Sequence, residues 1–205
     1  MLPPLAAAAL IVGLSGCSGA DLANPAPNTS LGQAPTSATT TTTTTTTSAK
    51  ADATDYRALL LMAADLSDAE DTFTERSRES QPNGVPGASA FFVNDKDTRA
   101  ISDTFLVYPD AATATATLRQ ASGTLTTLVA GGTPKPVPVG TDGVTISGTH
   151  PDVDKAVTLL FFTEGRALVR LEFQSAPGDA TTDRFVTAVG KMQQIALRVG
   201  LAGSA

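Results

Sequence analysis

Cys17 is the only cysteine among the 205 residues of this chain, so no disulfide can form within it. A domain that lacks disulfides has to be stabilised by burying apolar side chains away from water. This requirement restricts the globular part of the chain to folds with an ordinary hydrophobic core.

The position of Cys17 predicts where the protein resides. An apolar run at residues 5–14 precedes it, about as long as the hydrophobic part of a signal peptide and too short to cross a bilayer as a helix. The segment Leu14-Ser15-Gly16-Cys17 resembles the lipobox of bacterial lipoproteins, which signal peptidase II reads. The resemblance implies that residues 1–16 are removed and that the Cys17 thiol receives a diacylglyceryl group. Its two acyl chains would hold the protein stably on the exported face of the plasma membrane.

Residues 1–16 lack the Lys or Arg that usually opens a signal peptide. Either the true start codon lies upstream, which we expect, or the amino terminus alone supplies the charge. A buried structural cysteine is the alternative to lipidation, but little near Cys17 could bury it.

Composition divides the rest of the chain into a tether and one domain. Residues 17–53 include an unbroken Thr run at 39–47 and show no apolar periodicity, which predicts a disordered tether behind the acylated cysteine. Residues 54–201 have the size of a single domain. The net charge of -6 lies entirely outside residues 1–16, so it disfavours nucleic acid and anionic lipid as partners of the mature protein.

Hydrophobic periodicity predicts helices and strands in alternating groups. We expect a first helix from Thr54 or Asp55 to Leu66, a second over 109–129, and a third that Thr181 or Thr182 caps and Gly200 closes. The third should bury one face formed by Phe185, Val189, Met192, Ala196 and Val199. Strands are expected at 73–79, 88–93, 101–108, 137–139, 144–147, 156–163 and 167–174, the first of them at an edge and with the least support.

The short connections between these strands favour an antiparallel arrangement. The predicted fold class is therefore α+β, with an antiparallel sheet of about five to six strands packed against two to three helices. Residues 103–114, Asp-Thr-Phe-Leu-Val-Tyr-Pro-Asp-Ala-Ala-Thr-Ala, run from a strand into an Ala-rich helix, and a hairpin and a terminal helix follow. This order is similar to that of small α+β domains in mycobacterial and related actinobacterial envelope lipoproteins. Some of those are PsbP-like and others resemble the sensor domains of mycobacterial Ser/Thr kinases, which, unlike this chain, are disulfide-bonded.

No set of residues in the sequence predicts catalysis or a cofactor. His150 is the only histidine and lies in a predicted loop, so zinc would lack a second His or a free Cys. Acidic clusters at 65–71, 95–97 and 152–154 lack the spacing of an EF-hand. No Gly-x-Ser-x-Gly segment and no phosphate-binding loop occur.

Apolar residues on the predicted strands and on the second helix have two interpretations. They fill the core between sheet and helices, or they line a pocket for an apolar ligand beneath a helix rich in Ala and Thr. The residues that such a pocket would use are Phe105, Leu118, Leu125, Phe161 and Phe173. We therefore expect a non-enzymatic, membrane-anchored envelope lipoprotein that interacts with another envelope protein or binds a ligand. A lipid carrier is the alternative, and a hydrolase that uses His150 ranks third.

Overall fold

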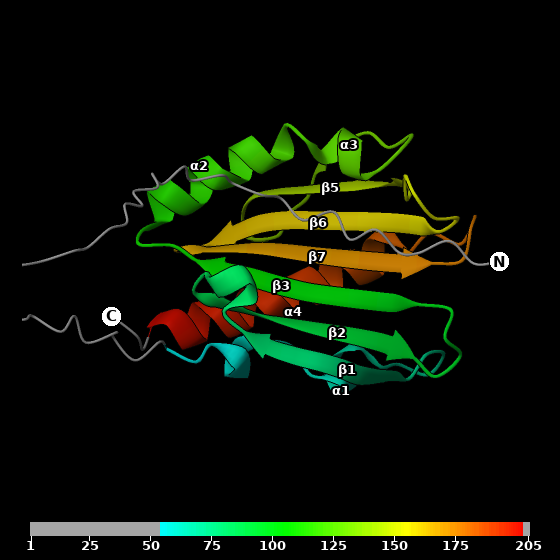
Figure 1. Ribbon diagram of the computed structural model, residues 1–205, viewed down its shortest axis with the longest axis horizontal. Coiled ribbons are helices and arrows are strands. Elements are labelled where there is room, and N and C mark those ends of the chain that lie inside the picture. Colours follow the sequence, from blue (N-terminus) through cyan, green and yellow to red (C-terminus); the bar gives the residue numbers. More distant parts are fainter. Residues whose placement is uncertain (1–53, 203–205) are drawn as a thin grey trace, which may run out of the picture. The chain divides into compact units, whose positions relative to one another are not determined.

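The computed structural model describes residues 54–202 (Figure 1). Residues Leu14, Ser15, Gly16 and Cys17 of the lipobox, and the expected signal peptide and tether, lie outside the described residues.

The described part of the chain is built on one seven-stranded antiparallel sheet, whose strands follow the order β1-β2-β3-β7-β6-β5-β4. Two runs of sequential hairpins, β1-β2-β3 and β4-β5-β6-β7, meet where β3 pairs with β7. The strands are β1 (Phe73–Ser80), β2 (Gly87–Asn94), β3 (Ala100–Val107), β4 (Lys135–Pro136), β5 (Thr141–Thr149), β6 (Ala156–Glu164) and β7 (Ala167–Ser175).

The pattern of buried and exposed residues along each strand depends on the place of that strand in the sheet. In β6 every residue except Glu164 is buried, because helices cover both of its faces, whereas β7 alternates more strongly between buried and exposed positions. The two strands pair up to Glu164 and Ala167, so the connecting turn has only two residues. Gly165 in this turn has a φ of +54°, a conformation that glycine adopts without steric cost.

Helices cover the two faces of the sheet unequally (Figure 1). The long helix α4 (Asp183–Ala202) lies behind the sheet, and α2 (Ala111–Ser122) packs on the opposite face against β5, β6 and β7. Asp110 begins α2 by accepting a hydrogen bond from the Thr113 amide at 2.7 Å, and this bond lowers the pKa of its carboxyl. The short elements are η1 (Arg57–Leu59), α1 (Ala63–Leu66), η2 (Pro82–Gly84) and α3 (Leu125–Leu128).

The sheet separates two hydrophobic cores. The larger core lies between the sheet and α4 and includes Phe92, Phe105, Phe162, Phe173 and Leu197. The smaller core lies beneath α2 and α3 and includes Leu118, Leu125, Ile146, Leu159 and Phe161. Neighbouring residues of β6 alternate between the two, since side chains of a strand point to opposite faces.

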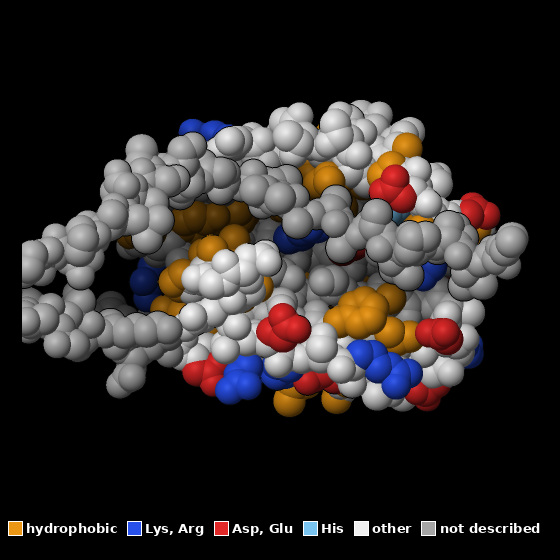
Figure 2. All heavy atoms as spheres, viewed as in Figure 1, with side chains coloured by type: hydrophobic (Ala, Val, Ile, Leu, Met, Phe, Trp, Pro, Cys, Tyr) orange, Lys and Arg blue, Asp and Glu red, His pale blue; other side chains and the backbone are white. Residues whose placement is uncertain are grey.

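The two edges of the sheet differ in how they avoid pairing with another strand. β1 carries exposed Glu and Arg side chains, and Figure 2 shows acidic and basic residues side by side along this margin of the molecule. At the other edge, β4 has two residues and ends on Pro136, which lacks the amide hydrogen that a further strand would need.

The predicted α+β class is confirmed, with seven strands where five to six were expected. Four α-helices replace the expected two to three, because the second predicted helix is divided at Gly123 into α2 and α3 and the first is reduced to the four residues of α1. None of the helices in residues 54–202 is long and apolar enough to cross a bilayer.

Three details of the prediction were wrong. The expected strand at 137–139 is a turn, in which the Val139 amide donates to the Val137 carbonyl and the neighbouring β4 has only two residues. The expected helix up to Leu66 is interrupted, because Leu60 and Met62 have extended backbone conformations. The buried stripe of α4 is rotated from the one predicted: Val199 is 71% exposed, and the buried residues are Val186, Val189, Gly190, Gln193 and Leu197.

Candidate functional site: an amphipathic pocket at the start of α4

A pocket of about 490 Å³ opens where the first turns of α4 meet the end of the sheet. Its walls come from the loop between α1 and β1, the beginnings of β1 and β3, the end of β7 and the beginning of α4. The apolar lining residues are Phe73, Ala100, Ile101, Phe173, Phe185 and Ala188, and the polar ones are Asp68, Glu70, Asp71, Arg99, Gln174, Thr181, Thr182 and Arg184.

The apolar wall continues the larger core. Phe73, Ile101 and Phe173 are all buried. The rings of Phe173 and Phe185 meet edge to face, with centroids 6.1 Å apart and an interplanar angle of 79°. Because these rings are fixed by the core beneath them, the apolar surface of the pocket is preformed.

A network of ion pairs fixes one side of the rim. Arg99 contacts the carboxylates of Asp71 at 3.2 Å and of Asp179 at 2.5 Å. It therefore joins the loop between α1 and β1 to the loop before α4. Asp71 also accepts hydrogen bonds from Asn94 at 2.9 Å and from Lys96 at 3.3 Å. These contacts satisfy Asp71 and Arg99 internally and leave them little capacity to bind a ligand.

The acidic loop before β1 is ordered by its own backbone. Asp68 Oδ1 accepts hydrogen bonds from the amides of Asp71 at 2.9 Å and Glu70 at 2.8 Å, and these bonds lower the pKa of the Asp68 carboxyl. The side chains of Glu70 and Arg184 make no hydrogen bond or ion pair with any other residue in 54–202. A ligand could therefore engage both without breaking an existing contact.

The start of α4 adds polar groups to the same rim. Thr182 accepts a hydrogen bond from the Phe185 amide through its side chain at 3.4 Å and from the Val186 amide through its carbonyl at 3.0 Å. Thr182 thus begins the helix, one of the two residues that the sequence predicted for this role. The rim as a whole combines hydroxyl, amide, carboxylate and guanidinium groups above an apolar floor.

The structure does not bring the five predicted pocket residues together. Phe105 and Phe173 belong to the core on the α4 face, whereas Leu118, Leu125 and Phe161 belong to the core beneath α2 and α3. All five are buried, and the sheet lies between the two groups, so they do not line one common space. Phe173 alone among them reaches the pocket at the start of α4.

Sequence reasoning missed this pocket because its lining residues come from four separate segments of the chain. We did single out the acidic cluster at 65–71, three of whose residues line the pocket, but we considered that cluster as a calcium site. In the structure Asp68 and Asp71 bond to backbone amides and basic side chains, and residues 54–202 contain no group of three or more His, Cys, Asp or Glu placed to hold a metal ion.

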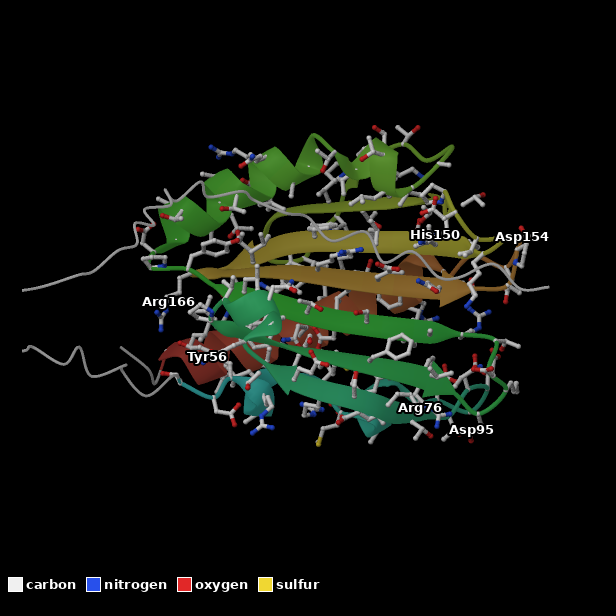
Figure 3. The ribbon with its side chains drawn as sticks, viewed as in Figure 1. Tyr56, Arg76, Asp95, His150, Asp154 and Arg166 are labelled. Carbon is white, nitrogen blue, oxygen red and sulfur yellow. The ribbon has the colours of Figure 1, made fainter. Side chains whose placement is uncertain are left out.

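His150 lies in the loop between β5 and β6, as predicted. Its Nδ1 accepts a hydrogen bond from the Asp152 amide at 3.1 Å, so the imidazole is engaged by its own turn. Figure 3 shows His150 and Asp154 at one end of the sheet and Tyr56 and Arg166 at the other. His150 is not among the residues that line the pocket.

No family model matches this chain, and no curated protein matches it. Among solved structures, the extracellular domain of PknH from Mycobacterium tuberculosis is similar, with 10% sequence identity and a TM-score of 0.49. The match covers 68% of this chain and 93% of that one.

Proposed function

We propose that this protein is a non-enzymatic, lipid-anchored envelope protein whose domain binds a small amphipathic molecule in the pocket at the start of α4. The anchor is the diacylglyceryl group on Cys17, added after recognition of Leu14, Ser15 and Gly16. In this proposal the domain stands on the exported face of the cell membrane and the pocket is its binding site.

The pocket carries the proposal, because it joins an apolar floor to two charged side chains, Glu70 and Arg184, that have no partner among residues 54–202. Ligand sites in proteins combine such a floor with a few polar groups that fix orientation, and about 490 Å³ is within the usual size range. The apolar part of a ligand would lie on Phe73, Ile101 and Phe173, and its polar part would meet Arg184, Glu70 and the Thr182 hydroxyl.

The surroundings of His150 support a binding role over hydrolysis. A general base needs a nucleophile and an orienting acid within hydrogen-bond reach. The Nδ1 atom of His150 accepts its hydrogen bond from the amide of Asp152, a backbone group of the same loop. The apolar carrier that we considered from the sequence would bind in this pocket, since the five residues proposed for a Phe-lined cavity are divided between two cores.

Filling the pocket tests the proposal. Ala188 is an exposed residue of α4 that lines the pocket, and Ala188→Trp would occupy the space without removing any described hydrogen bond. We expect the fluorescent probe 1-anilinonaphthalene-8-sulfonate, an aromatic anion, to bind the native protein. Its affinity for this variant should be lower by a factor of roughly ten or more.

Ile195→Trp is the matched control, because Ile195 is 59% exposed on the same helix and does not line the pocket. This variant should bind the probe as the native protein does. Equal binding by both variants, or no saturable binding by the native protein, would refute the pocket as the site.

A further inference from the structure

Residues 56–62, which we call the strap, cross the larger core outside the sheet. Tyr56, Leu60 and Leu61 of the strap are buried, and the Tyr56 ring meets the Phe105 ring edge to face at a centroid distance of 6.4 Å. The strap includes η1 and two extended residues and belongs to no ladder of the sheet. It can therefore separate from the domain without breaking any hydrogen bond between strands.

Three polar side chains from three different elements hold the backbone of the strap. Arg78 of β1 donates to the carbonyls of Arg57 at 2.8 Å and Leu61 at 2.7 Å. Gln193 of α4 donates through Nε2 to the Leu59 carbonyl at 3.0 Å. Asp103 of β3 accepts from the Leu61 amide through Oδ2 at 3.3 Å, the longest of the four bonds.

Two of these side chains are incompletely satisfied. Asp103 and Gln193 are both 0% exposed, and Asp103 Oδ1 and Gln193 Oε1 have no hydrogen-bond partner among the described residues. A buried oxygen without a partner is costly, and an ionised one costs far more than a neutral one. The seated strap thus closes an apolar space over a carboxyl group that has one long hydrogen bond.

The surroundings of Asp103 favour its neutral form. Its neighbours in register are Ala90 of β2 and Leu171 of β7. The charged group that acts on it is Arg78, which is itself paired with Glu75 at 2.6 Å. Burial raises the pKa of Asp103 to about 7, although the Leu61 amide and Arg78 act in the opposite direction.

We propose that the strap is a pH-dependent latch, which stays seated while Asp103 is protonated and separates from the domain when Asp103 ionises. Separation admits water to Asp103 and Gln193, and it exposes the apolar side chains of Tyr56, Leu60 and Leu61. It also frees the chain up to α1, so the connection between the sheet and residue 55 lengthens. The latch does not depend on the pocket or its ligand.

The direction of the pH dependence follows from the chemistry of an acid in an apolar site. The seated form binds the Asp103 proton more tightly than the released form, in which the carboxyl is hydrated. Raising the pH through about 7 therefore shifts the equilibrium toward release, and lowering it restores the seated form.

Tyr56→Trp supplies a reporter, since the chain contains no other tryptophan. In the intact chain, we expect acrylamide to quench this tryptophan roughly threefold more strongly at about pH 9 than at about pH 5, with a midpoint near 7. Far-UV circular dichroism should stay unchanged across this range because the sheet remains intact. Adding Asp103→Asn should abolish the transition, whereas adding Glu79→Gln, on the exposed edge strand, should leave it.

Pulse-labelled hydrogen exchange of the Leu61 amide in the unsubstituted chain provides a second measurement that needs no folded variant. After correction for the intrinsic rate at each pH, its protection should fall as the pH rises through about 7. Constant protection, a transition that persists in Asp103→Asn, or loss of the whole sheet signal at the same pH would overturn the proposal.

Discussion

At the scale of single residues, Glu164 links parts of the chain that are distant in sequence. It lies at the end of β6, and its carboxylate accepts hydrogen bonds from Gln194 at 2.8 Å and from Arg198 at 3.0 Å and 3.1 Å. The Glu164 side chain is only 16% exposed, and these contacts, with Arg198 first, lower the pKa of its carboxyl. One residue thereby fixes the β6-β7 turn against the second half of α4.

We expect Glu164→Gln to lower the free energy of unfolding at pH 7 by about 1 kcal/mol, because it removes a charge-assisted contact with an exposed arginine. A lowered pKa means that this stabilisation is present above the ordinary pKa of 4.5 and is lost as the pH falls through the native value. Urea unfolding should therefore show a smaller difference between variant and native protein at about pH 3 than at pH 7. Glu79→Gln is the control, and an equal effect of both substitutions would contradict the assignment.

At the scale of elements, the sequence predicted the structure best where local pattern and tertiary packing agree. The hairpin of β6 and β7 was predicted to within a residue, since apolar strands flank Glu164 and Gly165. The face of α4 was misjudged because its buried side includes Gly190, which packs against Leu160 of β6, and Gln193, whose amide donates to the Leu59 carbonyl. An apolar pattern reveals neither residue. The strap was predicted as a helix because nothing local indicates that Arg78, Asp103 and Gln193 take its backbone groups. The pocket was missed for the same reason, since no local pattern joins its separate segments.

Gly190 sets how closely α4 approaches the sheet. A Cβ atom at this position would lie 2.5 Å from the Leu160 side chain and 3.0 Å from that of Val139. We expect Gly190→Ala to lower the melting temperature and to cost about 2 kcal/mol through overpacking, despite the better helix propensity of alanine.

Gly123→Ala is the matched substitution at the end of α2, where the backbone is right-handed helical and a Cβ atom would make only one contact, at 3.4 Å. It should change the unfolding free energy by less than about 1 kcal/mol, in the stabilising direction. Equal destabilisation by the two substitutions would show that the lack of space between α4 and the sheet does not cause the effect of Gly190→Ala.

At the scale of the whole molecule, the proposed anchor and the described domain are separate in sequence. Both hydrophobic cores are formed by residues between Tyr56 and Leu201, whereas the lipobox ends at Cys17. We therefore propose that membrane attachment and folding are independent properties of the chain, so that either can be removed without the other.

Cys17→Ala should abolish metabolic labelling with fatty acid and leave the precursor uncleaved by signal peptidase II. The melting temperature of the domain should remain that of the native protein, because no core residue is changed. Ser18→Ala, which lies directly after the lipobox, should still be labelled. Labelling that survives in Cys17→Ala would refute lipidation at this residue.

The junction of β3 with β7 has a consequence for how the molecule is made. Val107 pairs with Ala167 and Ala100 with Gln174, so the centre of the sheet closes only when residues far apart in the chain meet. Each half is a meander of sequential hairpins that forms by short loop closures, whereas joining the halves requires a long one, which slows folding. Until β7 has been synthesised, β3 presents an unpaired and largely apolar edge. The newly made chain is therefore most prone to aggregate after β3 has been synthesised and before β7 has paired with it. A chaperone that covers β3 during this time would protect the chain.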